Sequence, residues 1–414
     1  MSANPLAAAL GHLKILDLSR VLAGPWSTQT LGDMGAEIWK IERPVTGDET
    51  RGWGPPYLRD PQADEPGISA YFASANRNKK SLAIDFTSSE GAELICQLAS
   101  KADIVIENFK VGGLKKYGLD YDSLQSRFPH LIYCSLTGFG QDGPESHRAG
   151  YDFMIQAMSG LMSVTGFPDD EPGGMPVKAG VALVDILTGL NATIAILAAL
   201  EHRKTSGKGQ HIDLAQAEAA MHFLTPAILD YTANGHIQTR AGNADSNFAP
   251  QGVYPTAGED EHIAIACETD AQWQALCELI SELNSLAENL NEATARVAQQ
   301  TALDIHIGRF TSNQPAAELE AELQARGIPA SVVMNSPELV ADPQLRHRGH
   351  FVNLPHHEAS ATVIESSRFH LSRSPTSVDT SAPTFNRDMM EVLTDVLGYD
   401  DERIGDLLVG GVFE

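Results

Sequence analysis

The segment from residue 181 to residue 200 is apolar on nearly every side of a helix, and Asp185 is its one ionisable side chain. A helix that is apolar all round belongs in the interior of a protein. The segment approaches membrane-spanning length, but Asp185, Asn191 and several Thr and Gly residues favour a buried core helix. Burying a carboxylate without a partner is energetically costly. Asp185 therefore either caps the helix or is used chemically in a cleft, and the residues alone leave both interpretations open.

Strand and helix patterns alternate from residue 13 to residue 137. The first unit runs from the strand LKILDL through a helix to the strand AEIWKIE, and the strands ADIVIENF and HLIYCSLT continue the pattern. This alternation predicts an α/β fold with a doubly wound, Rossmann-like sheet, which binds ligands at the carboxyl ends of its strands. The loop after the first strand, SRVLAGP, lacks the GxGxxG pattern, so the dinucleotide-binding fingerprint is absent.

The length of 414 residues exceeds the size at which a single core stops growing. After residue 230 the pattern changes to a polar connector, followed by the short strands VYPT, HIAIAC and IPASVVM and several helices. We therefore expect a large α/β domain made of residues 1–230 and completed by residues 340–414. Residues 231–339 should form a smaller α+β domain with its linkers.

Acidic residues dominate the charge: 54 Asp and Glu against 29 Lys and Arg give a formal net charge of -25. Nucleic acid and anionic membranes are therefore not expected as partners, because no broad basic surface is available. The four cysteines lack metal-binding spacing and indicate buried thiols of a reducing compartment. The N-terminal segment has no signal-peptide pattern, and we expect a cytoplasmic location. HExxH and GxSxG motifs are absent and no metal site is predicted.

A cluster of cations is predicted near the ends of the strands. Because the chain is acidic, any anionic ligand must be held by such a local cluster, although exposed lysines in loops are also ordinary. The cations concerned are Arg43, Arg77, Lys79, Lys80, Lys115 and Lys116.

Several segments, in order along the chain, resemble the class III CoA-transferases, the family of formyl-CoA transferase, carnitine CoA-transferase and α-methylacyl-CoA racemase. The segments are LDLSRVLAGPWSTQTLGDMGAEIWKIERP, NRNKKSLAID, DIVIENF, LIYCSLTGFGQDGP, GYDFMIQAMSGLMSVTG, VKAGVALVDILTG and ALEHRKTSGKGQHIDLA. Within the family, TRGWGPP, RAGYD and LGYDDERIGDLL look most like the branch of succinyl-CoA:glutarate CoA-transferase.

The resemblance implies that Asp185 is a nucleophile that attacks an acyl-CoA thioester and then carries CoA as an aspartyl thioester. It implies coenzyme A as a substrate, a small carboxylic acid as its partner, and no permanently bound cofactor. Trp53 corresponds to a tryptophan at the substrate mouth. The positions that correspond to CoA contacts, together with a neighbouring cation, are Arg43, Asn76, Arg77, Asn78, Lys79, Lys80, Asn108, Phe109, Lys115, Tyr151 and Asp152.

Arg20 and Arg51 are candidate anchors for a second carboxylate, because a guanidinium group can bind a carboxylate with two hydrogen bonds. The segment NADSNFAP (residues 243–250) replaces the glycine run of oxalate-using members, and Leu22 replaces a glutamine. Both departures argue against formyl or oxalyl as the acyl group. The resemblance also implies an intertwined homodimer.

The sequence is also compatible with two alternatives. A 2-methylacyl-CoA racemase would need a histidine at the position of Tyr151 for two-base exchange of a proton. A non-catalytic acyl-CoA-binding protein would use Asp185 as a helix cap alone.

Overall fold

The computed structural model describes residues 8–59, 67–287, 289–359 and 361–413. The chain divides into two compact units. Unit 1 contains the described residues up to Leu161, Ala179–Leu229, and the described residues from Pro343 onward. Unit 2 contains Met162–Lys178 and the described part of Asp230–Asp342. The second unit is thus assembled from two separate segments of the chain.

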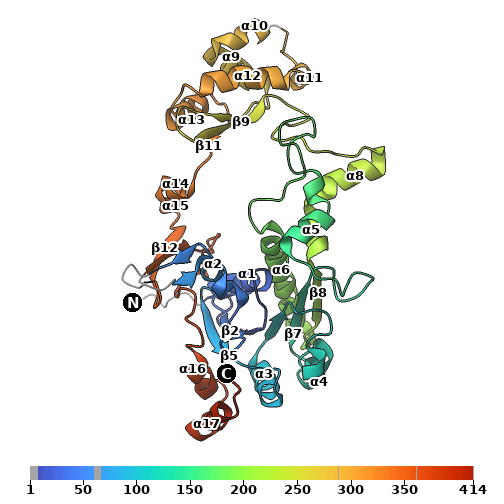
Figure 1. The fold of residues 1–414 in the computed structure, drawn as a ribbon, viewed down its shortest axis with the longest axis vertical. Helices are drawn as coiled ribbons and strands as arrows, with labels where there is room; N and C mark the ends of the chain where they lie inside the picture. Colours follow the sequence, from blue (N-terminus) through green and yellow to red (C-terminus); the bar gives the residue numbers. More distant parts are fainter. Residues whose placement is uncertain (1–7, 60–66, 288, 360, 414) are drawn as a thin grey trace. The chain divides into compact units, whose positions relative to one another are not determined.

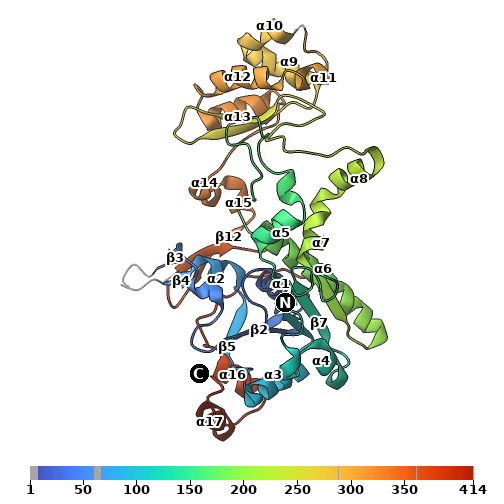
Figure 2. The same cartoon turned by 45° about the vertical axis from the view of Figure 1, so that its right-hand side comes forward.

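Unit 1 is built on a six-stranded sheet in the order β5-β2-β1-β6-β7-β8 (Figure 1, Figure 2). All five pairs of neighbouring strands are parallel, which confirms the predicted central parallel sheet. Numbered along the chain within this sheet, the spatial order is 3-2-1-4-5-6, the order of Rossmann-type folds. The strands are β1 (Lys14–Asp17), β2 (Glu37–Glu42), β5 (Lys79–Ala83), β6 (Ile104–Glu107), β7 (Ile132–Thr137) and β8 (His211–Ala215).

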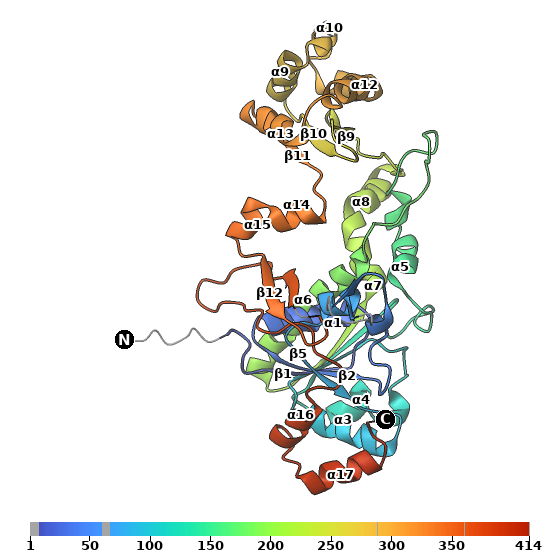
Figure 3. The ribbon, with the colours of Figure 1, turned by 60° about the vertical axis from the view of Figure 1, so that its left-hand side comes forward.

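Alternate side chains of β1, β2, β6 and β7 enter two different apolar clusters, because successive residues of a strand point to opposite faces. Ile15 lies in one cluster with α1 and α6, and Leu16 lies in the other with α3, α4, α16 and α17. Figure 3 shows these two groups of helices on opposite sides of the sheet. Unit 1 is therefore a three-layered α/β/α structure. The helices are α1 (Ala23–Asp33), α3 (Ser89–Lys101), α4 (Tyr121–Arg127), α6 (Leu183–Ser206), α16 (Met389–Asp395) and α17 (Asp401–Val409).

The long helix α6 corresponds to the apolar segment of the sequence and packs directly against α1. A Cβ at Gly189 would lie 2.8 Å from the carbonyl oxygen of Ala23, so only glycine permits this close approach. By length and composition alone α6 could cross a membrane, but half of its most apolar window is buried within the protein. Such burial is typical of a core helix.

Smaller elements complete unit 1. The hairpin of β3 (Tyr57–Leu58) and β4 (Ile68–Ser69) and the hairpin of β12 (Phe351–Pro355) and β13 (Ala361–Glu365) are both antiparallel. Residues of β4 and α2 form an apolar cluster with Ala359 and Ala382, so two segments that lie far apart in the sequence pack together here. The remaining helices are α2 (Ala70–Ala75), α5 (Asp152–Met158), α7 (Gln216–Met221) and α15 (Pro343–His347), with α8 (Thr225–Asn234) at the boundary of the units.

Unit 2 contains a three-stranded antiparallel sheet in the order β11-β10-β9. Its apolar cluster is centred on Trp273, which is fully buried among residues of the strands and helices. The strands predicted in this region are present as β9 (Gln251–Pro255), β10 (His262–Ala266) and β11 (Ala330–Val332). The helices are α9 (Asp270–Leu279), α10 (Asn284–Ala287), α11 (Ala293–Val297), α12 (Gln300–Thr311), α13 (Ala316–Ala325) and α14 (Ser336–Ala341).

Candidate active site

A cavity of about 270 Å³ lies at the carboxyl ends of the central strands of unit 1. The strand order reverses between β1 and β6, and the loops that leave these two strands diverge and create a crevice. Residues that follow both strands line the cavity, as do residues after β7 and at the start of α5. The lining is Arg20, Val21, Leu22, Ala23, Glu49, Trp53, Asn108, Phe109, Lys110, Val111, Leu136, Thr137, Gly138, Ser146, His147, Arg148, Ala149, Gly150, Tyr151, Asp152, Asp185 and Gln216.

Asp185 lies on the wall of this cavity, with 9% of its surface exposed. The side-chain amide of Gln216 donates a hydrogen bond of 2.8 Å to its Oδ1 atom. Burial and, to a lesser extent, the charge of Asp152 raise the pKa of Asp185 to about 7, although the Gln216 hydrogen bond opposes this rise. A carboxylate with such a pKa at the wall of a cavity is a candidate for a reactive group.

The cap of helix α6 is supplied by Asp152 rather than by Asp185. The Asp152 Oδ1 atom accepts hydrogen bonds from the backbone N–H groups of Val184 (2.8 Å) and Asp185 (3.3 Å). The helix begins at Leu183, which places Asp185 inside the first turn. The interpretation of Asp185 as the cap is therefore wrong, because a carboxylate from α5 satisfies the free N–H groups of the helix start.

The structure brings part of the predicted set together. The cavity is lined by Asp185, by four of the positions that correspond to CoA contacts, by one of the two arginine anchors and by the predicted tryptophan. These residues are Arg20, Trp53, Asn108, Phe109, Tyr151, Asp152 and Asp185.

The predicted cations Arg77, Lys79 and Arg51 do not line the cavity and are already paired. Arg77 donates two hydrogen bonds, of 3.0 and 2.6 Å, to the carboxylate of Asp33, and both side chains are buried. Lys79 lies 3.1 Å from Asp17, and burial lowers the pKa of Lys79 to about 8. Arg51 binds both carboxylate oxygens of Glu42 and packs on an aromatic ring. In these positions the three cations hold the fold together instead of facing a ligand.

The other members of the predicted cradle also lie outside the cavity. Asn76 and Asn78 bind backbone and side-chain groups of unit 1, and Lys80 pairs with Glu37 and Glu391. Arg43 is exposed after β2. Lys115 lines a separate cavity of about 200 Å³ that also contains Glu107.

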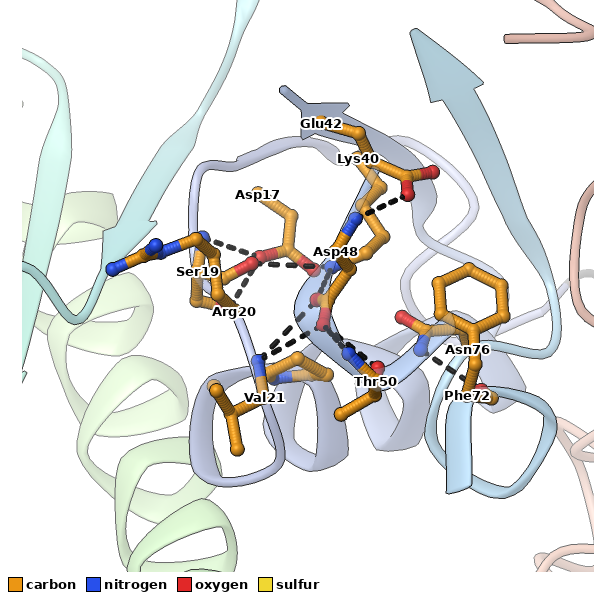
Figure 4. A network of polar contacts seen from close by, with 12 residues as sticks. Asp17, Ser19, Arg20, Val21, Lys40, Glu42, Asp48, Thr50, Phe72 and Asn76 are labelled. Atoms are coloured by element: carbon orange, nitrogen blue, oxygen red, sulfur yellow. Dashed lines mark hydrogen bonds and ion pairs between the residues drawn. The ribbon is translucent and has the colours of Figure 1, made fainter. Parts of the chain in front are cut away.

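A buried polar network holds the loop between β1 and α1 (Figure 4). The carboxylate of Asp48 lies 2.9 Å from the Lys40 ammonium and accepts the backbone N–H of Val21 at 3.3 Å. Val21 has φ of 67°, a conformation that β-branched residues rarely adopt. Asn108 binds the backbone N–H and C=O of Arg20, at 2.9 and 2.7 Å. Asp48 and Asn108 therefore both fix the backbone of this cavity wall through hydrogen bonds.

Arg20 is the predicted arginine that does reach the cavity. Its guanidinium group lies 4.7 Å from the centre of the Phe109 ring and 2.5 Å from Glu49, and this ion pair is partly exposed. An exposed ion pair is weak, so an incoming carboxylate can compete for the guanidinium group.

Sequence reasoning missed Lys110, His147, Arg148 and Gln216, all of which line the cavity. Lys110 follows Asn108 and Phe109 directly, so its position after a strand was a usable signal. Gln216 carried no signal, because it meets Asp185 only when α7 folds against α6.

The fold and this carboxylate-lined crevice define the class of protein. Residues 10–389 match the sequence profile of CoA-transferase family III, and the chain belongs to this family of enzymes.

Among its relatives is succinate–glutarate CoA-transferase of Agrobacterium fabrum, which is 40% identical over 94% of this chain and 95% of the relative. Succinyl-CoA:glutarate CoA-transferase of Mus musculus is 35% identical over 98% of this chain and 90% of the relative. A crystal structure of a CaiB/BaiF family protein from Brucella suis superposes with a TM-score of 0.85. It is 40% identical, and the match covers 95% of this chain and 99% of that protein. These findings confirm the resemblance noted in the sequence.

Proposed function

We propose that this CoA-transferase moves CoA from succinyl-CoA to a dicarboxylic acid such as glutarate, and that Asp185 is its nucleophile. The names of the two relatives support the substrates. The position of Asp185 supports the mechanism: one oxygen is held by Gln216, and within the described part of the chain no hydrogen bond is found to the other. That second oxygen, on a cavity wall at the switch point of the sheet, is the single observation on which the proposal depends.

In the first half of the reaction, the Oδ2 atom of Asp185 attacks the thioester carbonyl of succinyl-CoA. The carbon–sulfur bond breaks, CoA leaves as a thiolate, and a mixed anhydride of succinate and Asp185 remains. The thiolate then attacks the aspartyl carbonyl carbon and expels succinate, which leaves CoA bound to Asp185 as a thioester.

In the second half, the carboxylate of the acceptor acid attacks the aspartyl thioester and releases the CoA thiolate again. The thiolate attacks the acceptor carbonyl of the new anhydride, which frees the Asp185 carboxylate and the new acyl-CoA. Each bond that breaks is matched by one that forms, so the sequence needs no water and no net proton.

The cavity supplies charges for these anionic substrates. Lys110 and Arg148 lie on its wall although the chain as a whole is strongly acidic. Local positive charge inside a crevice attracts an anion despite an opposite net charge. We assign Arg20 to the distal carboxylate of the dicarboxylic acid, because it shares the cavity with Asp185 while Arg51 is held by Glu42.

Trapping the enzyme-bound intermediate tests the proposal. The protein is mixed with succinyl-CoA, quenched with hydroxylamine and analysed by peptide mass spectrometry. We expect a hydroxamate at Asp185 in the wild type and none in Asp185→Asn, which keeps the shape of the side chain. Asp395→Asn, an exposed aspartate at the end of α16, serves as the matched control and should be labelled at Asp185.

An unlabelled Asp185 during full turnover of glutarate would defeat the mechanism. Deuterium uptake from solvent at the α-carbon of a 2-methylacyl-CoA, without exchange of acids, would instead indicate the racemase reaction.

A homodimer is also proposed. The outer face of α6 exposes Leu190, Ile194 and Leu197, and water contact with such an apolar face is unfavourable. Sedimentation at micromolar concentration should show twice the mass of the chain. The cytoplasmic location stays a prediction.

A further inference from the structure

The start of α7 positions the side chain of Gln216 against Asp185. Gln216 is the first residue of that helix and follows β8 directly. The next residue, Ala217, donates its backbone N–H to the carbonyl oxygen of Gly138 at 3.0 Å, which fixes the corner between β8 and α7 against the loop after β7. The Gln216 side chain is 7% exposed, lines the cavity, and donates from Nε2 to the Oδ1 atom of Asp185 at 2.8 Å.

We propose that Gln216 is a catalytic residue that stabilises the negative charge on Oδ1 of Asp185 whenever the aspartyl carbonyl is attacked. This inference rests on the proposed function, because it assigns a role to Gln216 within the aspartyl mechanism. The amide is neutral and cannot neutralise the charge by giving up a proton. Its contribution is a hydrogen bond of fixed direction to the atom where charge develops.

The movement of electrons gives the reason. In the mixed anhydride and in the aspartyl thioester, the aspartyl carbon is bonded to Oδ1 as a carbonyl and to a leaving group through its other position. When the CoA thiolate attacks that carbon, the new carbon–sulfur bond forms and the carbonyl electron pair moves to Oδ1. When the pair returns, the bond to succinate breaks. The Gln216 amide therefore contacts a neutral carbonyl oxygen before the attack and a negatively charged oxygen during it. Because its hydrogen bond is stronger to the charged oxygen, it lowers the activation barrier of the attack.

The first step of the reaction differs from the later ones. When Asp185 attacks succinyl-CoA, the negative charge develops on the thioester carbonyl oxygen of the substrate and not on Oδ1. Gln216 does not act on that atom. The loss of its amide should therefore slow the attack of CoA on the anhydride more than the formation of the anhydride. This asymmetry separates a catalytic role from a merely structural one.

The test uses Gln216→Met, which keeps a similar length and removes both N–H donors. We expect kcat to fall by about 100-fold or more, as for other lost oxyanion donors, while KM for succinyl-CoA stays within a few-fold of the wild type. Hydroxylamine quenching should show a larger fraction of Asp185 trapped, and intact-protein mass before quenching should match the succinyl adduct instead of the CoA adduct. Gln97→Met is the control, since Gln97 lies on α3 and bonds to Tyr399.

The outcomes are distinct. Wild-type kcat and an unchanged ratio of adducts in Gln216→Met would overturn the role of Gln216 and leave Asp185 as the nucleophile. If that variant does not fold, as judged by circular dichroism, Gln216→Leu decides. Leucine has no donor under any condition, so a kcat loss of about 100-fold or more is expected and retained activity overturns the inference. Absence of any Asp185 adduct in the active wild type would refute the proposed mechanism itself.

Discussion

Replacing Asp185 by asparagine should stabilise unit 1 at neutral and alkaline pH while it abolishes transfer. Burial and the charge of Asp152 raise the pKa of Asp185 to about 7 from its usual 3.8. When folding raises the pKa of a carboxyl group, the folded state binds the proton more tightly than the unfolded state does. Ionisation of the group therefore lowers the free energy of unfolding. The wild type therefore loses stability as the pH rises from about 4 to about 7. Asparagine carries no charge and still accepts the Gln216 hydrogen bond, so the variant avoids this loss.

The size of the effect follows from the same shift. A rise of about 3 pH units at about 1.4 kcal/mol per unit corresponds to about 4 kcal/mol in the free energy of unfolding. At about pH 5 most of this loss of stability has not yet occurred, because pH 5 lies only about one unit above the usual pKa of the carboxyl group. The gain from Asp185→Asn should therefore be about 2–3 kcal/mol larger at about pH 8 than at about pH 5.

Urea unfolding at the two pH values measures this difference, with tryptophan fluorescence as the signal. Trp26 and Trp39 both report on unit 1. Asp395→Asn again provides the control for the loss of one charge, and its gain should not differ between the two pH values. An equal gain at both pH values for Asp185→Asn, or a loss at the higher one, would refute the reasoning about the buried charge.

Three further predictions address the site. The kcat/KM for succinyl-CoA should rise with pH through about 7 and then level off, because the ionised form of Asp185 attacks; a flat profile from about pH 5 to about pH 9 would contradict this. Lys40→Met should destabilise the protein by about 3–5 kcal/mol in urea unfolding, because it leaves Asp48 buried without its cation. Arg20→Ala should raise KM for glutarate about tenfold and leave KM for a monocarboxylic acceptor nearly unchanged, since a charged hydrogen bond is worth about 1.5–3 kcal/mol; equal changes for both acids would remove Arg20 as the anchor.

The layout of the sheet was predictable because its signals are local. Each strand is a short apolar run and each helix carries its own apolar face, so the alternation along the chain defines the layers. The strand order does not follow from this alternation alone, and it is the order that places the ends of β1 and β6 side by side and brings Asn108 to Arg20.

The pairing of charges was not predictable, because the partners lie far apart in the sequence. Asp33 lies 44 residues before Arg77, and Asp17 lies 62 residues before Lys79. A cation at the end of a strand gives the same sequence pattern whether it is free to bind an anionic ligand or is already paired with a carboxylate. The same limit applies to the helix cap, since Asp152 precedes Val184 by 32 residues.

The last helices of the chain pack into the same apolar cluster as the first strands, with Val392, Leu393, Ile404 and Leu407 against residues such as Leu16. During translation, unit 2 is synthesised in full while this cluster still lacks one of its walls. At about 5–20 residues per second, the remaining segment from Pro343 onward takes several seconds to emerge. For that interval the apolar side chains that α16 and α17 later cover are exposed to solvent, and exposed apolar surface of this kind favours aggregation.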